Sequence, residues 1–150
     1  MFDQYDEESS KFLTENDVVE SVAAHLAKNG WTIVSFCDTW KAGIDIHAAR
    51  GTQTLYVEAK GITSSKPSSS RYGKRQSASQ IFIQVAAALL KCAELRSAYP
   101  DAGVAIAAPA HAEMIRRVEM IKPVLEAASI SVIWVDTQMA VSCWNAAWEI

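Results

Sequence analysis

Two charged residues that are separated by one position, Glu58 and Lys60, are the residues of this sequence best placed to do chemistry. Residues two apart in a β-strand share a face, so the carboxylate and the ammonium group would lie side by side. Asp45, in the preceding apolar segment, could lie across the sheet from this pair if the strand register permits. Two converging carboxylates suit Mg²⁺ or Mn²⁺, and a neighbouring lysine can orient or deprotonate an attacking water molecule. The three residues form a candidate hydrolytic site.

Glu15 is a further candidate ligand, because it lies in the first turn of a predicted helix. The segment from Thr14 to Asp17 matches a capping box, which starts a helix that should end near residues 29–30. Apolar residues recur along it at intervals of three and four: Val18, Val19, Val22, Ala23 and Leu26. At about 100° per residue Glu15 falls in line with this stripe, whereas Glu20 lies off it. The helix dipole also favours an acid in the first turn whatever its function, so both interpretations stay open.

The elements that must position these residues are three short strands. Residues 31–36 and 43–49 have strand-like composition, and residues 54–60 follow as an antiparallel partner across a turn at residues 50–52. His47 would share a strand face with Asp45, either as an outer partner of the site or as a simple polar strand residue. The competing interpretation of the charged residues is a salt-bridge cluster on the solvated face of a hairpin, where cross-strand charge pairs are common.

The rest of the sequence completes an α/β pattern. Two helices and two strands are predicted, at residues 80–99, 104–108, 111–128 and 130–136 in the order helix, strand, helix, strand. Residues 141–150 fit either a last strand or a short helix. We predict a flexible acidic arm over residues 1–13 and a single domain over residues 14–150. The order αβββαβαβ predicts a central mixed sheet with helices on both faces.

The order and spacing of the candidate residues resemble those of a known superfamily. A glutamate in an early helix is followed by Gly43-Ile44-Asp45-Ile46 and then by Val57-Glu58-Ala59-Lys60-Gly61. This pattern resembles the PD-(D/E)XK nuclease superfamily, which includes restriction endonucleases and Holliday-junction resolvases. Ile44 stands where the superfamily name has proline, a position that is loose within the superfamily. The resemblance implies a restriction-endonuclease-like, three-layer α/β/α fold.

The resemblance also implies a function, namely metal-dependent hydrolysis of phosphodiester bonds in DNA by an endonuclease. Mg²⁺ (or Mn²⁺) would be bound by Asp45 and Glu58, with Glu15 completing the site, and Lys60 would assist the nucleophilic water. Members of the superfamily often carry a glutamine on the helix after this strand. Gln80 and Gln84 both qualify, since residues four apart share one helical face.

A long serine-rich loop, residues 62–79, follows the proposed site. Loops of this length inside a domain are usually functional or disordered. Between Lys60 and Arg75 the chain has five cationic residues and no acidic one, on a protein of net charge -3. Because the loop begins beside the proposed metal site, we expect it to contact DNA through phosphate-binding cations and a stacking tyrosine. The residues concerned are Lys66, Arg71, Tyr72, Lys74 and Arg75. A solvated loop without a partner is the alternative.

Composition restricts the remaining possibilities. The chain is 50% hydrophobic and 21% charged, which is typical of a globular protein, and no apolar run approaches the roughly 20 residues of a membrane span. The acidic amino terminus lacks the basic start and apolar core of a secretory signal, so we expect a cytoplasmic protein. The cysteines Cys37, Cys92 and Cys143 lack the close spacing of zinc sites or redox motifs, which indicates small buried apolar side chains.

Duplex or branched DNA is the expected partner, with no membrane association. A homodimer and membership of a larger defence or repair complex are further hypotheses. Two other functions compete with the nuclease: a non-catalytic nucleic-acid-binding or complex-forming module that retains the fold, and a partner-interaction protein that uses the acidic arm and the basic loop. The last of these predicts no dependence on divalent metal.

Overall fold

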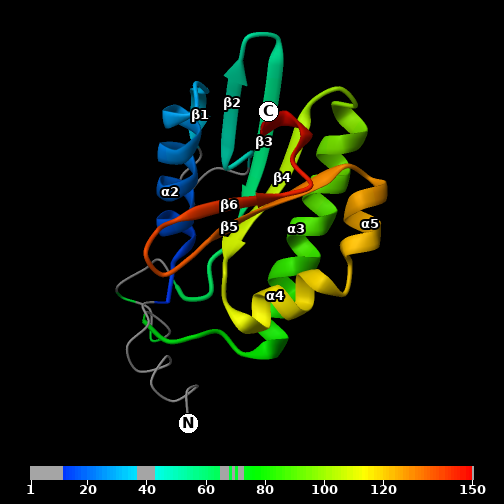
Figure 1. Ribbon diagram of the computed structural model, residues 1–150. Helices are drawn as coiled ribbons and strands as arrows, with labels where there is room; N and C mark the ends of the chain where they lie inside the picture. Colours follow the sequence, from blue (N-terminus) through cyan, green and yellow to red (C-terminus); the bar gives the residue numbers. More distant parts are fainter. Residues whose placement is uncertain (1–11, 37–42, 65–67, 69, 71–72, 150) are drawn as a thin grey trace.

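The protein has a central mixed β-sheet with helices packed on both faces. The computed structural model describes residues 12–36, 43–64, 68, 70 and 73–149 (Figure 1). The elements are α2 (Glu15–Lys28), β1 (Thr32–Phe36), β2 (Ile46–Arg50), β3 (Gln53–Ala59), α3 (Ala78–Ala98), β4 (Gly103–Pro109), α4 (Ala112–Glu119), α5 (Lys122–Ala127), β5 (Ile130–Val135), β6 (Val141–Trp144) and the 3-10 helix η1 (Ala147–Glu149). The predicted α/β class with a mixed sheet is confirmed.

Within the described ranges, six strands lie in the order β1-β2-β3-β4-β5-β6. Strands β1, β2 and β3 are antiparallel neighbours, β3, β4 and β5 run parallel, and β6 returns antiparallel to β5. The predicted hairpin is confirmed, with Arg50 paired to Gln53 and Gly51 at a φ of 60° in the turn. Because β3, β4 and β5 are parallel, their carboxyl ends share one edge of the sheet.

Helix α2 begins where the sequence pattern predicts. The backbone N of Asp17 donates to Thr14 Oγ1 at 3.0 Å, and the backbone N of Thr14 donates to Asp17 Oδ2 at 2.9 Å, which completes the capping box. Four residues of the predicted apolar stripe are buried: Val18, Val22, Ala23 and Leu26. They pack on one face of the sheet, while α3, α4 and α5 cover the other face. Strand β3 is therefore buried on both sides.

Several predicted boundaries differ from those in the structure. The helix expected over residues 111–128 is two helices, α4 and α5. Pro123 lies in the first turn of α5, and proline has no N–H to continue the hydrogen bonds of α4. Residues 141–149, whose sequence fits either a strand or a short helix, contain both, so a sixth strand follows the predicted order αβββαβαβ. Leu13, placed in the flexible arm, is 1% exposed, and its carbonyl accepts from the backbone N of Ile62 at 3.0 Å.

Helix α3 is, among the described residues, the one helix long and apolar enough to span a membrane by length and composition alone. Five of its residues face the sheet and are buried: Ile81, Val85, Ala88, Cys92 and Leu95. Core helices of globular domains pass the same test, so this single helix is weak evidence for a membrane segment.

Candidate active site

The register of the β2–β3 hairpin brings Asp45 to Glu58. Ile46 pairs with Val57, so Asp45, the residue before β2, comes opposite Glu58. Asp45 Oδ2 accepts a hydrogen bond from the backbone N of Ala59 at 2.7 Å. The predicted strand start at residue 43 is wrong, since β2 begins at Ile46 and Asp45 occupies a bend before it. The bend lets the aspartate side chain fold over the end of β3.

Glu58 is buried, with 9% of its surface exposed. Its Oε1 lies 3.4 Å from Lys60 Nζ, while its Oε2 is buried and has no hydrogen-bond partner among the described residues. Burial, followed by the negative charge of Asp45, raises the pKa of Glu58 to about 7, against the opposing effect of Lys60. A buried carboxylate oxygen without a partner costs free energy unless a proton or a cation meets it. Its burial contradicts the alternative of a solvated salt-bridge cluster.

Asp45 and Lys60 complete the centre of the site. Burial raises the pKa of Asp45, and the N–H of Ala59 and the charges of Lys60 and Lys91 partly offset this. The Lys60 side chain is 15% exposed, and its backbone N donates to the carbonyl of Ala107 on β4 at 2.9 Å. This bond fixes Lys60 at the carboxyl edge of the parallel strands.

Glu15 joins the site from the start of α2. Burial and then the charge of Asp45 raise its pKa, while Lys60 lowers it, so Glu15 lies within electrostatic range of both groups. The contact depends on Gly61, where an added Cβ would overlap the backbone N of Glu15 and lie 2.6 Å from the backbone carbon of Thr14. Glycine lets the segment after β3 lie directly against the first turn of the helix. The structure thus brings together Glu15, Asp45, Glu58 and Lys60.

The two candidate glutamines occupy different positions. Gln80 Oε1 accepts from the backbone N of Ser77 at 2.8 Å, and Ser77 Oγ accepts from the backbone N of Gln80 at 3.2 Å. This capping box starts α3 two residues earlier than predicted and occupies the side-chain oxygen of Gln80. Gln84 is half-buried one turn further along the helix.

Lys91 is a site residue that the sequence reasoning missed. Lys91 is half-buried on α3, and its charge lowers the pKa of Asp45, so it lies within electrostatic range of that carboxylate. Lys91 follows Gln84 by two helical turns, so the two side chains share a face. This spacing is the signal in the sequence that could have indicated it.

The serine-rich loop returns to the site at its base. The backbone N of Gln76 donates to the carbonyl of Ile62, next to Gly61, at 2.8 Å. Lys74 and Arg75 are exposed just before this closure. The other residues predicted to contact DNA, Lys66, Arg71 and Tyr72, lie outside the described residues.

His47 belongs to an aromatic row on the hairpin. It pairs with Tyr56 across the β2–β3 ladder, and their ring centroids are 4.8 Å apart. Tyr56 in turn lies 4.7 Å from the ring of Tyr99, at the end of α3. The position of His47 in this row favours a packing role.

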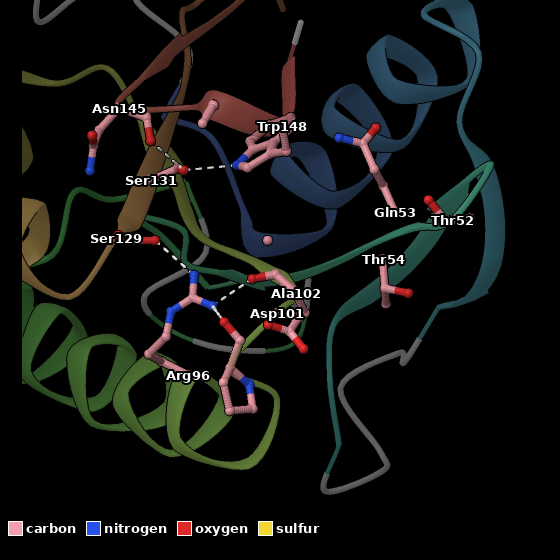
Figure 2. Close-up of a pocket in the computed structure, with 13 residues that line it drawn as sticks. Thr52, Gln53, Thr54, Arg96, Asp101, Ala102, Ser129, Ser131, Asn145 and Trp148 are labelled. Atoms are coloured by element: carbon pink, nitrogen blue, oxygen red, sulfur yellow. Dashed lines mark hydrogen bonds between the residues drawn. The ribbon is translucent and has the colours of Figure 1, made fainter.

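A cavity of about 560 Å³ opens at the opposite edge of the sheet, where β3, β4 and β5 begin (Figure 2). Several of its polar side chains bond one another or the backbone. Trp148 Nε1 donates to Ser131 Oγ at 2.8 Å, and Ser131 Oγ donates to the carbonyl of Asn145 at 2.8 Å. These bonds hold the carboxyl-terminal segment on the sheet, which indicates a structural role for this region.

Arg96 is the centre of that region, and we expect Arg96→Ala to lower the free energy of unfolding. The guanidinium donates to five backbone carbonyls, those of Tyr99, Pro100, Ala102, Ala128 and Ser129. Charge-assisted bonds of this kind are strong, so the expected loss is about 2–4 kcal/mol by urea unfolding. Arg96→Lys, with fewer donors, should restore only part of it. Equal stability of wild type and Arg96→Ala would contradict this role.

The similarity of this chain to known proteins is limited to its fold. No family model and no curated protein matches the chain. An XisH family protein from Nostoc punctiforme is similar, with 19% sequence identity and a TM-score of 0.54 over 84% of this chain and 96% of that one. An fdxN element excision controlling factor protein from Anabaena variabilis has 24% identity and a TM-score of 0.47, over 87% and 98% of the two chains. The first of these structures shows that the chain shares its mixed α/β fold with an XisH family protein.

Proposed function

We propose that this protein is a Mg²⁺-dependent endonuclease of the PD-(D/E)XK type, with a restriction-endonuclease-like fold, that hydrolyses phosphodiester bonds in DNA. The observation that carries the proposal is the buried Glu58 Oε2, which has no partner among the described residues and lies beside Asp45 and Lys60. A carboxylate held in this way is costly to the fold, and a metal-dependent reaction explains its retention.

The residues present fit a divalent cation. Asp45 and Glu58 would hold Mg²⁺ or Mn²⁺, and Glu15 would complete a set of oxygen ligands of the kind these ions prefer. When bound, the ion supplies Lewis acidity toward the phosphate and an activated water molecule. Glu58 Oε2 is the ligand atom that has no hydrogen-bond partner among the described residues and is available to a cation.

The chain's own cations would act on the phosphate. Lys60, held 3.4 Å from Glu58 at the edge of the sheet, is placed to orient the attacking water and to stabilise negative charge that develops in the transition state. Lys91 adds positive charge from the helix side. The exposed Lys74 and Arg75 would bind phosphate groups of the DNA. Such contacts position a strand but do not read its sequence.

The test is cleavage of labelled linear duplex, branched and single-stranded DNA with Mg²⁺ or Mn²⁺ and with a chelator. We expect cutting that requires metal and that falls by about 10³-fold or more in Asp45→Ala and Lys60→Ala, since each removes transition-state stabilisation. The matched controls are Asp101→Ala and Lys28→Ala, at exposed positions outside the site. Cutting that survives the chelator or Asp45→Ala would contradict the proposal. DNA binding without any cutting would favour the non-catalytic module.

A further inference from the structure

A second group of metal-ligand side chains lies at the other end of α2. His25 in the last turn of α2, Cys143 in β6 and Glu149 in η1 each offer one ligand atom, and these atoms lie within 4.8 Å of one another. Ten residues of helix separate His25 from Glu15, which at about 1.5 Å per residue is roughly 15 Å. The group is therefore distinct from the carboxylate site.

The fold holds all three elements in place. Cys143 pairs with Ile133 in the β5–β6 ladder, which fixes the thiol along the edge of the sheet. Glu149 follows Trp148, whose Nε1 bonds Ser131 Oγ at 2.8 Å and whose ring contacts Trp31 edge-on at 6.0 Å. His25 and Cys143 are half-buried, whereas Glu149 is exposed. Burial, and then the charge and the hydrogen bond of Glu149, raise the pKa of Cys143 to about 12, so the thiol and the carboxylate are already in contact.

We propose that His25, Cys143 and Glu149 bind Zn²⁺, with a water molecule in the fourth position. An imidazole nitrogen, a thiolate and a carboxylate are all ordinary zinc ligands, and the soft sulfur disfavours Mg²⁺. Tetrahedral bonds of about 2.0–2.3 Å require ligand atoms about 3.3–3.8 Å apart. The exposed Glu149 can supply the closing movement of about 1 Å by side-chain rotation.

Bound zinc would join α2 to the carboxyl-terminal segment. The Zn–S bond forms as the S–H bond of Cys143 breaks, and the proton leaves to solvent. Because the three ligands are far apart in the sequence, the folded chain binds the ion much more tightly than the unfolded chain. Zinc therefore stabilises the fold by mass action.

Co²⁺ titration of the full chain in saturating Mg²⁺ tests this without any measure of nuclease activity. Co²⁺ bound to a thiolate gives a near-ultraviolet charge-transfer band. We expect this band at one equivalent of Co²⁺ and its loss on addition of Zn²⁺. Cys143→Ser should abolish the band, while the control variants Cys37→Ser and Cys92→Ser should retain it.

Zn²⁺ affinity tests the other two ligands. Loss of an outer-shell partner weakens metal binding by about 10–100-fold, so loss of a direct ligand in His25→Gln or Glu149→Gln should weaken it by more than about 100-fold. Glu126→Gln, at an exposed position on α5, is the control. Melting curves without metal verify that each variant folds. Absence of the thiolate band in the wild type, or its persistence in Cys143→Ser, would overturn the proposal.

Discussion

Glu58→Gln is expected to abolish metal-dependent cleavage and, at the same time, to stabilise the metal-free protein above pH 7. Glutamine keeps the shape of the side chain but cannot carry the negative charge that the cation requires. The same charge destabilises the folded protein, because the carboxylate is buried beside Asp45 and one of its oxygens has no partner among the described residues. One substitution should therefore change activity and stability in opposite directions.

The pH dependence follows from the raised pKa of Glu58. Below its ordinary value of 4.5 the carboxyl group is protonated in both the folded and the unfolded chain, so burial adds no ionisation cost. As the pH rises from 4.5 to about 7, the unfolded chain ionises first and the wild type loses stability; the loss is complete above that range. At pH 8 we expect Glu58→Gln to be more stable by roughly 1–2 kcal/mol, less than the full shift implies because the carboxylate is partly hydrated.

Urea unfolding at pH 4, 6 and 8 in the presence of chelator measures this difference. The control is Glu94→Gln, at an exposed position on α3, which should show no such trend. Burial also raises the pKa of Asp45 and of Glu15, and both residues remain in the variant. Because the charges of Asp45 and Glu58 act on each other, the difference between the two proteins reports the ionisation of this carboxyl pair. Added Mg²⁺ should stabilise the wild type and not Glu58→Gln. A variant no more stable than the wild type at pH 8 would contradict the burial cost.

Local sequence patterns predicted the parts of the fold that depend on neighbouring residues. The capping box at Thr14 and the turn at Gly51 are each set within a few positions of the chain. The two-residue alternation of β3 correctly separated the face of Val57 from that of Glu58. Once the hairpin turn is placed, its register determines that Asp45 approaches Glu58. The centre of the candidate site was therefore predictable from a short segment.

Contacts between distant segments were not predictable in this way. Leu13 is buried in the core with the apolar face of α2, and its carbonyl accepts from the backbone N of Ile62; nothing in residues 1–13 encodes these partners. The spacing of the cysteines likewise gives no sign that the fold places Cys143 near His25. Helical and strand periods indicate which face of an element is apolar, but not which remote element covers it.

The candidate site places a charged residue, Glu58, in a strand that is buried on both faces. Strand β3 is buried on both faces, so its sequence should be apolar throughout, and Glu58 breaks that rule. Lys60 forms an ion pair with one oxygen of Glu58, which offsets part of the cost of burying the carboxylate. The charge of Lys91 acts on the adjacent Asp45. Departures from the local rules of folding are expected where function requires them.

Gly61→Ala is expected to damage both stability and cleavage, although Gly61 has no side chain to take part in the reaction. A Cβ at this position would overlap the backbone N of Glu15, and it would lie 2.6 Å from the carbon of Thr14 and 3.1 Å from the carbonyl oxygen of Leu13. These are backbone atoms, which cannot rotate away, so the first turn of α2 must shift. Overpacking of this kind costs about 1–3 kcal/mol.

Cleavage should fall together with stability. A shift of about 1 Å in a reacting group can reduce the rate by about 10²-fold, and here the shift moves Glu15 relative to Asp45 and Lys60. Rates are to be compared at saturating Mg²⁺ and at a temperature where melting curves show both proteins folded. Gly51→Ala is the matched control. Its Cβ would meet open space, so only its φ of 60° is strained; we expect about 1 kcal/mol of destabilisation and normal cleavage.

Glu15→Gln tests whether the loss of cleavage expected in Gly61→Ala arises from Glu15 rather than from the loss of stability. It removes the charge of Glu15 and leaves the backbone contact at Gly61 intact, so it should reduce cleavage without the loss of stability seen in Gly61→Ala. If Gly61→Ala instead cuts DNA at the wild-type rate while its stability falls, the position of α2 does not matter for the reaction. Glu15 would then be only an acid favoured by the helix dipole in the first turn, and the metal would depend on Asp45 and Glu58 alone.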